Sequence, residues 1–110
     1  MVDNIIWTFD NLELEKRLIG PVNQTLDLIN TEIGVNINHI PNHFILNDGL
    51  DKIEIIKTFL LVLTKLSNNG IDFTDRDLVH IIQILKVSDN LDSKIDEIVE
   101  FSFYKIRQFH

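Results

Sequence analysis

The pattern of hydrophobic and polar positions predicts a strand followed by two helices at the start of the chain. Residues 4–9 (NIIWTF) are β-branched and aromatic and precede a turn-prone Asp-Asn pair, which is typical of a strand. Residues 12–19 carry leucine and isoleucine near helical spacing, with Asn11 as the expected N-cap and Gly20 at the end. A second helix is expected to begin within residues 21–23 and to run to Ile33. In the strand, alternation places Ile5, Trp7 and Phe9 on one face and Ile6 and Thr8 on the other.

Two more strands and a long helix are predicted next. Residues 35–40 (VNINHI) alternate between apolar and polar positions, which indicates a strand with one buried face. Pro41 and Asn42 suit the centre of a tight turn, because proline presets its own backbone angle and asparagine tolerates the next one. Residues 43–47 return as the partner strand, and a helix over residues 50–66 is hydrophobic around much of its circumference.

The remaining residues predict two further helices. The sequence TDRD, starting at Thr74, fits a capping box with Asp77 in place of the usual glutamate. The helix that it opens carries Leu78, Ile81, Ile82 and Leu85 on one face. A last helix over residues 91–108 is hydrophobic on more than half of its surface. We expect a single compact unit, in which residues 71–110 form a helical extension packed on a domain of residues 1–70.

The predicted order of residues 1–70, strand-helix-helix-strand-strand-helix, resembles a type I KH domain, an α+β fold with a three-stranded sheet. In KH domains, a Gly-x-x-Gly loop between the first two helices clamps the backbone of about four nucleotides. Here that connection, which we call the corner, reads Gly20-Pro21-Val22-Asn23. Asn23 replaces the second glycine, and Pro21 has no amide hydrogen to donate. The same residues also suit a glycine C-cap followed by a proline at a helix start. The corner is therefore either a phosphate-binding loop or a turn without a ligand.

Charge limits what the corner can bind. Lys16 and Arg17, directly before the corner, are the only adjacent basic pair in the chain. They would contact phosphates if RNA binds there, and would otherwise be ordinary cations at a helix C-terminus. The net charge of −7, from 10 Lys+Arg and 17 Asp+Glu, repels polyanions at long range. Strong autonomous binding of nucleic acid is therefore not expected.

Composition narrows the class of protein. A chain of 110 residues, 45% hydrophobic and 25% charged, is expected to form one soluble domain. No hydrophobic run approaches the roughly 18 residues that a membrane span needs, and the start of the chain lacks the features of a signal peptide. A cytoplasmic location without membrane contact is therefore expected. The absence of cysteine excludes disulfides, thiolate metal sites and cysteine nucleophiles.

Four segments together resemble the N-terminal domain of PhoH-like proteins: FDNLELEKRLIGPVNQTLDLINTEIGVNIN, HFILNDG, LTKLSNNG and FTDRDLVHII. The resemblance covers residues 6–85 and implies a KH-like module that precedes a P-loop ATPase domain, in proteins linked to RNA metabolism and phosphate starvation. None of the four glycines precedes a lysine, so the P-loop is absent and ATP binding would belong to a longer parent protein. At the turn between the second and third predicted strands, the family commonly has Arg-Gly-Asn. This chain has Ile40-Pro41-Asn42 there and lacks the phosphate-binding arginine.

These features predict a non-enzymatic module that contacts single-stranded RNA weakly and positions it for an ATPase domain absent from this chain. The expected contact residues are Lys16, Arg17, Gly20, Pro21, Val22 and Asn23. The alternative is a protein-interaction or oligomerisation domain that keeps the KH shape and has lost RNA binding. The acidic charge favours this alternative, whereas the fold and the family resemblance favour RNA. No catalytic residue, cofactor or metal ligand is expected.

Other polar side chains have ordinary structural explanations. His39 and His43 flank the predicted turn and could approach each other across the hairpin, but two histidines alone predict surface residues rather than a zinc site. His80 has no nucleophile to activate. Glu13 and Glu15, two apart on a helix, are expected to point to different sides as solvated or capping acids.

The positions of aromatic and branched residues predict which side chains form the core, and that both faces of the sheet are covered. Core packing rather than base stacking is expected for Trp7, Phe9, Phe44 and Phe59. The first and third strands carry hydrophobic residues on both faces, so both faces of the sheet need a cover. We expect the last two helices, a symmetric partner chain or both to provide it.

Overall fold

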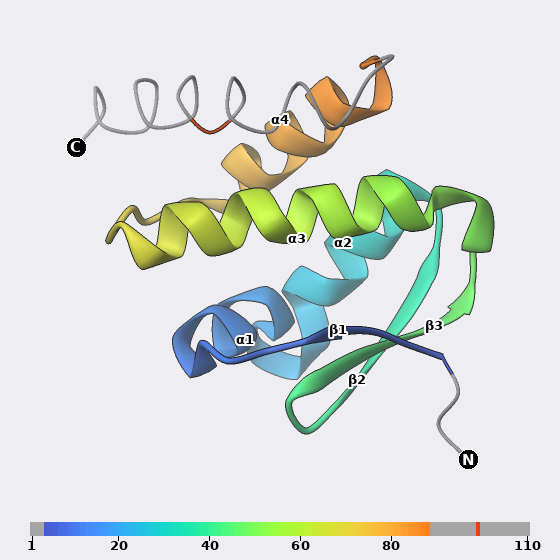
Figure 1. The fold of residues 1–110 in the computed structure, drawn as a ribbon, viewed down its shortest axis with the longest axis horizontal. Coiled ribbons are helices and arrows are strands. Elements are labelled where there is room, and N and C mark those ends of the chain that lie inside the picture. The colour runs from blue at the N-terminus through green and yellow to red at the C-terminus, as the bar shows by residue number, and fades with distance from the viewer. Residues whose placement is uncertain (1–3, 89–98, 100–110) are drawn as a thin grey trace. The chain divides into compact units, whose positions relative to one another are not determined.

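The structure, a computed structural model, describes residues 4–88 and Val99 (Figure 1). These residues form a three-stranded antiparallel sheet and four α-helices, which confirms the predicted α+β class. The chain divides after Ile53 into two compact units, Met1–Ile53 and Glu54–His110. A domain boundary at residue 70 stays a prediction. Apart from Val99, the helix predicted over residues 91–108 lies outside the described residues.

The chain begins with a strand and a helix where the sequence predicts them. Strand β1 spans Ile5–Thr8 and helix α1 spans Leu12–Ile19. The side chain of Asn11 caps α1 by accepting a hydrogen bond from the backbone N–H of Leu14 at 3.1 Å. Gly20 ends α1 with φ 70°, and its own N–H donates to the carbonyl of Lys16 at 3.0 Å. Local capping chemistry therefore sets both ends of this helix.

The second helix begins with a tight turn. Residues Pro21–Asn23 form a short 3₁₀ turn, which leads into helix α2 at Gln24–Ile33. Gly34 ends α2 in the left-handed region, at φ 84°, with its N–H bound to the carbonyl of Asn30 at 2.8 Å. The predicted extent of this helix is confirmed.

Two strands follow as a hairpin. Strands β2 (Asn36–Ile40) and β3 (His43–Asp48) pair antiparallel across the predicted turn at Pro41-Asn42. Asn42 has φ 71°, which asparagine tolerates better than most residues. The sheet order is β1-β3-β2, so β3 is central and the other two strands are its edges.

The pairing of β1 corrects one prediction. Ile5 pairs with Ile45 and Trp7 with Phe44, so residues two apart on β1 pair with neighbours on β3. Because neighbours in a strand point to opposite faces, Ile5 and Trp7 do not share a face, and the strict alternation predicted for β1 is wrong. Ile5 is 42% exposed. The cover predicted for the second face of the sheet stays a prediction.

The core of residues 1–53 comes from one face of each element. Helix α2 lies against α1 and β2 (Figure 1). The buried hydrophobic residues of this unit are Ile6, Phe9, Leu14, Leu18, Leu26, Ile29, Ile33, Ile37, Phe44 and Leu46. The rings of Phe9 and Phe44 meet edge to face, with centroids 4.8 Å apart. Core packing is confirmed for Phe9 and Phe44, while Trp7 is half-buried.

Two helices, α3 and α4, follow the sheet within residues 4–88. A 3₁₀ turn at Leu50–Lys52 leads into helix α3 at Ile53–Asn68, which starts later and ends later than predicted. Helix α4 spans Asp75–Lys86 and opens with the predicted capping box between Thr74 and Asp77. The hydrophobic residues buried in the two helices are Ile56, Phe59, Leu60, Val62, Leu63, Leu66, Leu78, Ile81, Ile82 and Leu85. Among the helices that the structure describes, none is long and apolar enough to cross a membrane.

Candidate nucleic-acid interface

The corner between α1 and α2 has an unusual backbone. Gly20 (φ 70°), Val22 (φ 48°) and Asn23 (φ 60°) all have positive φ. For valine, whose side chain is branched at Cβ, the left-handed region is strained by about 1–2 kcal/mol. The structure around the corner must therefore hold this conformation in place.

Thr25 packs closely against Gly20, the first residue of the corner. A Cβ on residue 20 would lie only 2.4 Å from Oγ1 of Thr25, so glycine is required there by space as well as by φ. Thr25 is buried, and its Oγ1 accepts a hydrogen bond from Nη1 of Arg17 at 3.5 Å. Thr25 is not among the residues that the sequence predicts for the corner. Its position five residues after a required glycine was the only signal.

The predicted contact residues surround an exposed tip. Pro21, Val22 and Asn23 are exposed, and Val22 exposes 94% of its surface. Lys16 is exposed and Arg17 is half-buried in the last turn of α1, directly before the tip. The corner therefore presents two cations and one hydrophobic side chain at a single place on the chain.

The start of α2 lacks a side-chain cap. Asn23 occupies the N-cap position in a left-handed conformation, and its side chain makes no capping hydrogen bond. The N–H of Gln24 is bound to the carbonyl of Pro21. Amide groups in the first turn of a helix attract anions when no side chain occupies them. The positive end of α2 follows the last turn of α1, which carries Lys16, although the exposed Asp27 in the first turn of α2 reduces the positive charge.

A buried carboxylate, Glu15, directly precedes these cations in the sequence. The Glu15 side chain is 8% exposed, and its Oε2 lies 2.6 Å from Nε2 of His39 and accepts the backbone N–H of Asn42 at 2.8 Å. Burial by itself raises the pKa of Glu15. The hydrogen bonds from His39 and Asn42, together with the charges of His39 and His43, outweigh burial and lower this pKa below its ordinary value.

This arrangement corrects the prediction for Glu15. Instead of a solvated or capping acid, Glu15 is a buried group that ties α1 to the β2–β3 hairpin. The available signal was its place beside Leu14 and three residues before Leu18, on the buried side of α1.

The two hairpin histidines point to opposite faces of the sheet. His39 pairs with Phe44, and its ring lies edge to face with that of Phe44, with centroids 6.0 Å apart. His43 pairs with Ile40 and lies with Nδ1 3.1 Å from Oγ1 of Thr8. The expectation that the histidines could approach each other is therefore wrong, because the two-residue turn places them on opposite faces. No three His, Cys, Asp or Glu side chains gather as a possible metal site within the part of the chain that the structure describes.

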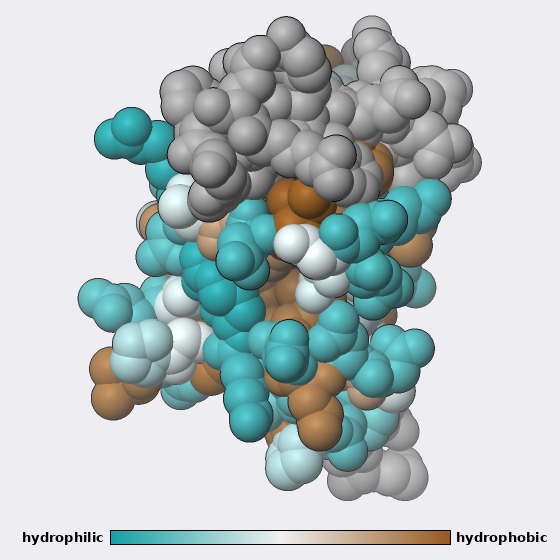
Figure 2. Space-filling model, turned by 90° about the vertical axis from the view of Figure 1, so that its left-hand side faces the viewer, coloured by the Kyte–Doolittle hydropathy of each residue, from teal (hydrophilic) through white to brown (hydrophobic). Residues whose placement is uncertain are grey.

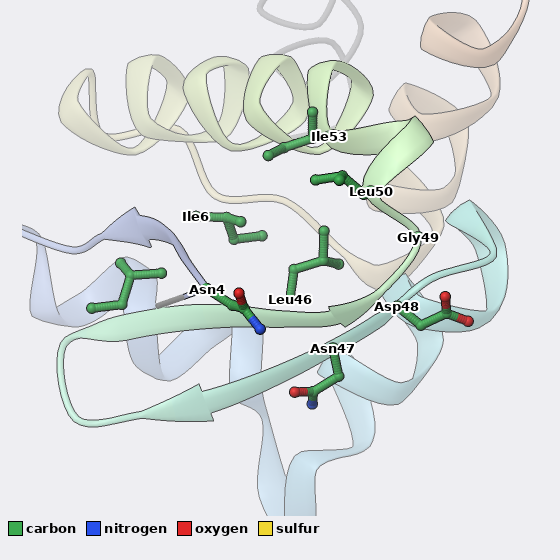
Figure 3. A pocket seen from close by; sticks show the side chains of 9 residues that line it. Asn4, Ile6, Leu46, Asn47, Asp48, Gly49, Leu50 and Ile53 are labelled. Atoms are coloured by element: carbon green, nitrogen blue, oxygen red, sulfur yellow. The ribbon is translucent and has the colours of Figure 1, made fainter. Parts of the chain in front are cut away.

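A pocket of about 340 Å³ lies away from the corner, beside the end of β3 (Figure 3). The side chains of Ile6, Leu46, Leu50 and Ile53 point into it, while those of Asn47 and Asp48 point away (Figure 3). The pocket and the corner share no residue. The pocket is not apparent in the sequence, because its lining comes from the separate segments β1 and β3, the 3₁₀ turn after β3 and the first residue of α3.

The corner and the Glu15 contact are thus the features that carry a functional argument. The resemblance to the N-terminal domain of PhoH-like proteins stays a prediction from the sequence. No family model matches the chain, and neither does a curated protein or a solved structure.

Proposed function

We propose that this chain is a KH-like module that makes weak contact with the backbone of single-stranded RNA at the corner. The element order β1-α1-α2-β2-β3-α3 and the sheet order β1-β3-β2 support this, because a type I KH domain has the same order of elements. The observation that carries the proposal is the exposed corner, which joins an uncapped helix start to Lys16 and Arg17. In a longer parent protein, such a module would position RNA for an ATPase domain.

The contact is electrostatic and short-ranged. Amide groups in the first turn of α2 other than that of Gln24 donate to a phosphate oxygen, and Lys16 and Arg17 neutralise neighbouring phosphates. Pro21 supplies no donor, which removes one hydrogen bond that another residue could give. The net charge of −7 opposes the approach of RNA from a distance. Weak binding follows from this balance.

Binding of a labelled single-stranded RNA at several salt concentrations tests the proposal. Because two cations contact phosphates, the logarithm of the affinity should fall with the logarithm of the salt concentration with a slope of about −1.4. The double variant Lys16→Ala/Arg17→Ala should lose most of the binding and the salt dependence. A matched control, Lys57→Ala/Arg76→Ala, removes two exposed cations elsewhere and should bind as the unaltered chain does.

Two results would contradict RNA contact at the corner. In one, the unaltered chain and the Lys16→Ala/Arg17→Ala variant bind RNA equally. In the other, neither binds. An unfolding curve for each variant shows whether losing the bond between Arg17 and Thr25 has altered the fold itself.

A second candidate function, a protein-interaction module, is favoured by Val22. A hydrophobic side chain that is 94% exposed gains little from a phosphate backbone, but it gains from burial in a partner protein. Absence of RNA binding in every variant, together with binding of a protein that depends on Val22, would favour this function.

A further inference from the structure

The pocket beside β3 has a hydrophobic interior, and its lining residues include one acid, Asp48. Four hydrophobic side chains converge in it, and Leu50 continues the lining outward with 71% of its surface exposed (Figure 3). Its volume of about 340 Å³ is ample for a branched side chain. Asp48 borders the pocket and Asp51 follows Leu50, and both acids are exposed. The pocket therefore suits a hydrophobic group that is accompanied by positive charge.

The chain itself carries such a group. The large hydrophobic residues that are exposed in the described residues are Ile5, Leu12, Val22, Leu50 and Val87. Ile5 and Leu50 belong to the pocket. Of the other three, Val22 is the most exposed and projects from the strained corner, with Lys16 and Arg17 close behind it. On the face seen in Figure 2, hydrophilic residues predominate between separate hydrophobic groups.

Charge decides how two copies could meet at the pocket. In a two-fold pairing of pocket against pocket, Asp48 and Asp51 would face their own counterparts, and like charges oppose such an interface. When the corner of one copy meets the pocket of another, Lys16 faces these acids instead. Complementary charge therefore favours a contact between corner and pocket over a dimer of pocket against pocket.

We propose that a second copy of this chain docks head to tail, with Val22 of one copy in the pocket of the other. The interface is weak, because one side chain and a few charges bury far less than the roughly 1,200 Å² of stable complexes. Docking covers the corner. Self-association and RNA binding therefore compete, and only this competition rests on the function proposed above.

Sedimentation velocity over a concentration series of roughly 10 μM to 1 mM tests the docking. The sedimentation coefficient of the unaltered chain should rise with concentration. Val22→Asn removes the hydrophobic group and introduces a residue that tolerates the left-handed backbone. Leu50→Ser removes one hydrophobic side chain from the pocket. Each variant should remain monomeric. Val87→Asn, an equally drastic change at a position 82% exposed, should associate as the unaltered chain does.

A mixture of variants distinguishes docking of corner into pocket from a symmetric pairing of pocket against pocket. The Val22→Asn variant keeps an intact pocket, and the Leu50→Ser variant keeps an intact corner. Mixed in equal amounts, they should form dimers that grow no further. A monomeric unaltered chain, association by Val22→Asn alone or a mixture that stays monomeric would overturn the docking. Single-stranded RNA should shift the unaltered chain towards monomers, and a failure of that shift alone would count against RNA contact while leaving the docking intact.

Discussion

The Glu15 carboxylate lies 2.6 Å from Nε2 of His39 and thereby joins helix α1 to strand β2. The backbone N–H of Asn42 completes the site, so the buried charge has two donors. A buried carboxylate without such partners is costly, which means that the helix and the hairpin stabilise each other through this group. Lys16 and Arg17 follow Glu15 directly, so the same contact fixes the part of α1 that carries the candidate RNA contacts.

Removing the charge of Glu15 should destabilise the fold. Glu15→Gln keeps the size of the side chain but weakens the bonds to His39 and Asn42, so the free energy of unfolding should fall by about 1–3 kcal/mol. Urea unfolding measures the change. Glu13→Gln, an exposed position on the same helix, serves as the control and should alter stability by less than about 0.5 kcal/mol. Equal effects of the two variants would show that the Glu15 contact does not stabilise the protein.

Lowering the pH should remove the contribution of Glu15 to the free energy of unfolding. The pKa of Glu15 is lower in the folded protein than in the unfolded chain, so the folded state binds this proton less readily. The resulting stability is fully present above the unfolded value of about 4.3 and is lost as the pH falls through the lower folded pKa. Urea midpoints between neutral and acidic pH should therefore show a gap between the unaltered chain and Glu15→Gln that narrows only at acidic pH. A gap that is independent of pH would contradict the lowered pKa.

Replacing Val22 should stabilise the protein. Asparagine tolerates the left-handed backbone at φ 48° better than valine does, and the side chain of Val22 contributes little packing because it is 94% exposed. Val22→Asn should raise the free energy of unfolding by about 0.5–1 kcal/mol. Val87→Asn provides the control, since Val87 is exposed at an ordinary φ of −101°. A loss of stability in Val22→Asn would show that the corner does not strain this residue.

The side chain of Asn30 should stabilise β2, which is an edge strand of the sheet. This side chain donates to the carbonyl of Ile37 at 2.9 Å and accepts the N–H of Ile37 at 2.8 Å. These two bonds satisfy the backbone groups that a neighbouring strand would otherwise bind. Asn30→Ala leaves both backbone groups without these bonds and should cost about 1–3 kcal/mol in thermal or urea unfolding. Amide hydrogen exchange at Ile37 should accelerate in the same variant. Asn38→Ala, at an exposed position of β2, should leave that exchange rate unchanged if the Asn30 contact is responsible.

Local chemistry made most of the elements predictable. The Asn11 cap, the glycines after α1 and α2, the turn at Pro41-Asn42 and the box at Thr74 all depend on residues close in sequence. The features that the sequence did not predict depend on distant pairs. Glu15 meets His39 from 24 residues away, and the irregular pairing of Trp7 is visible only in the register with β3. The corner was located correctly, but no local pattern indicates a valine in the left-handed region.

The most direct test of RNA contact at the corner follows backbone amide resonances during a titration with a single-stranded RNA. Contact at the corner predicts that the largest shifts occur at Lys16, Arg17, the corner itself and the first turn of α2, and that added salt reverses them. Residues of α4 provide an internal reference and should shift little. Shifts that concentrate outside the corner, or no shifts at a concentration where binding is measured by another method, would contradict the account.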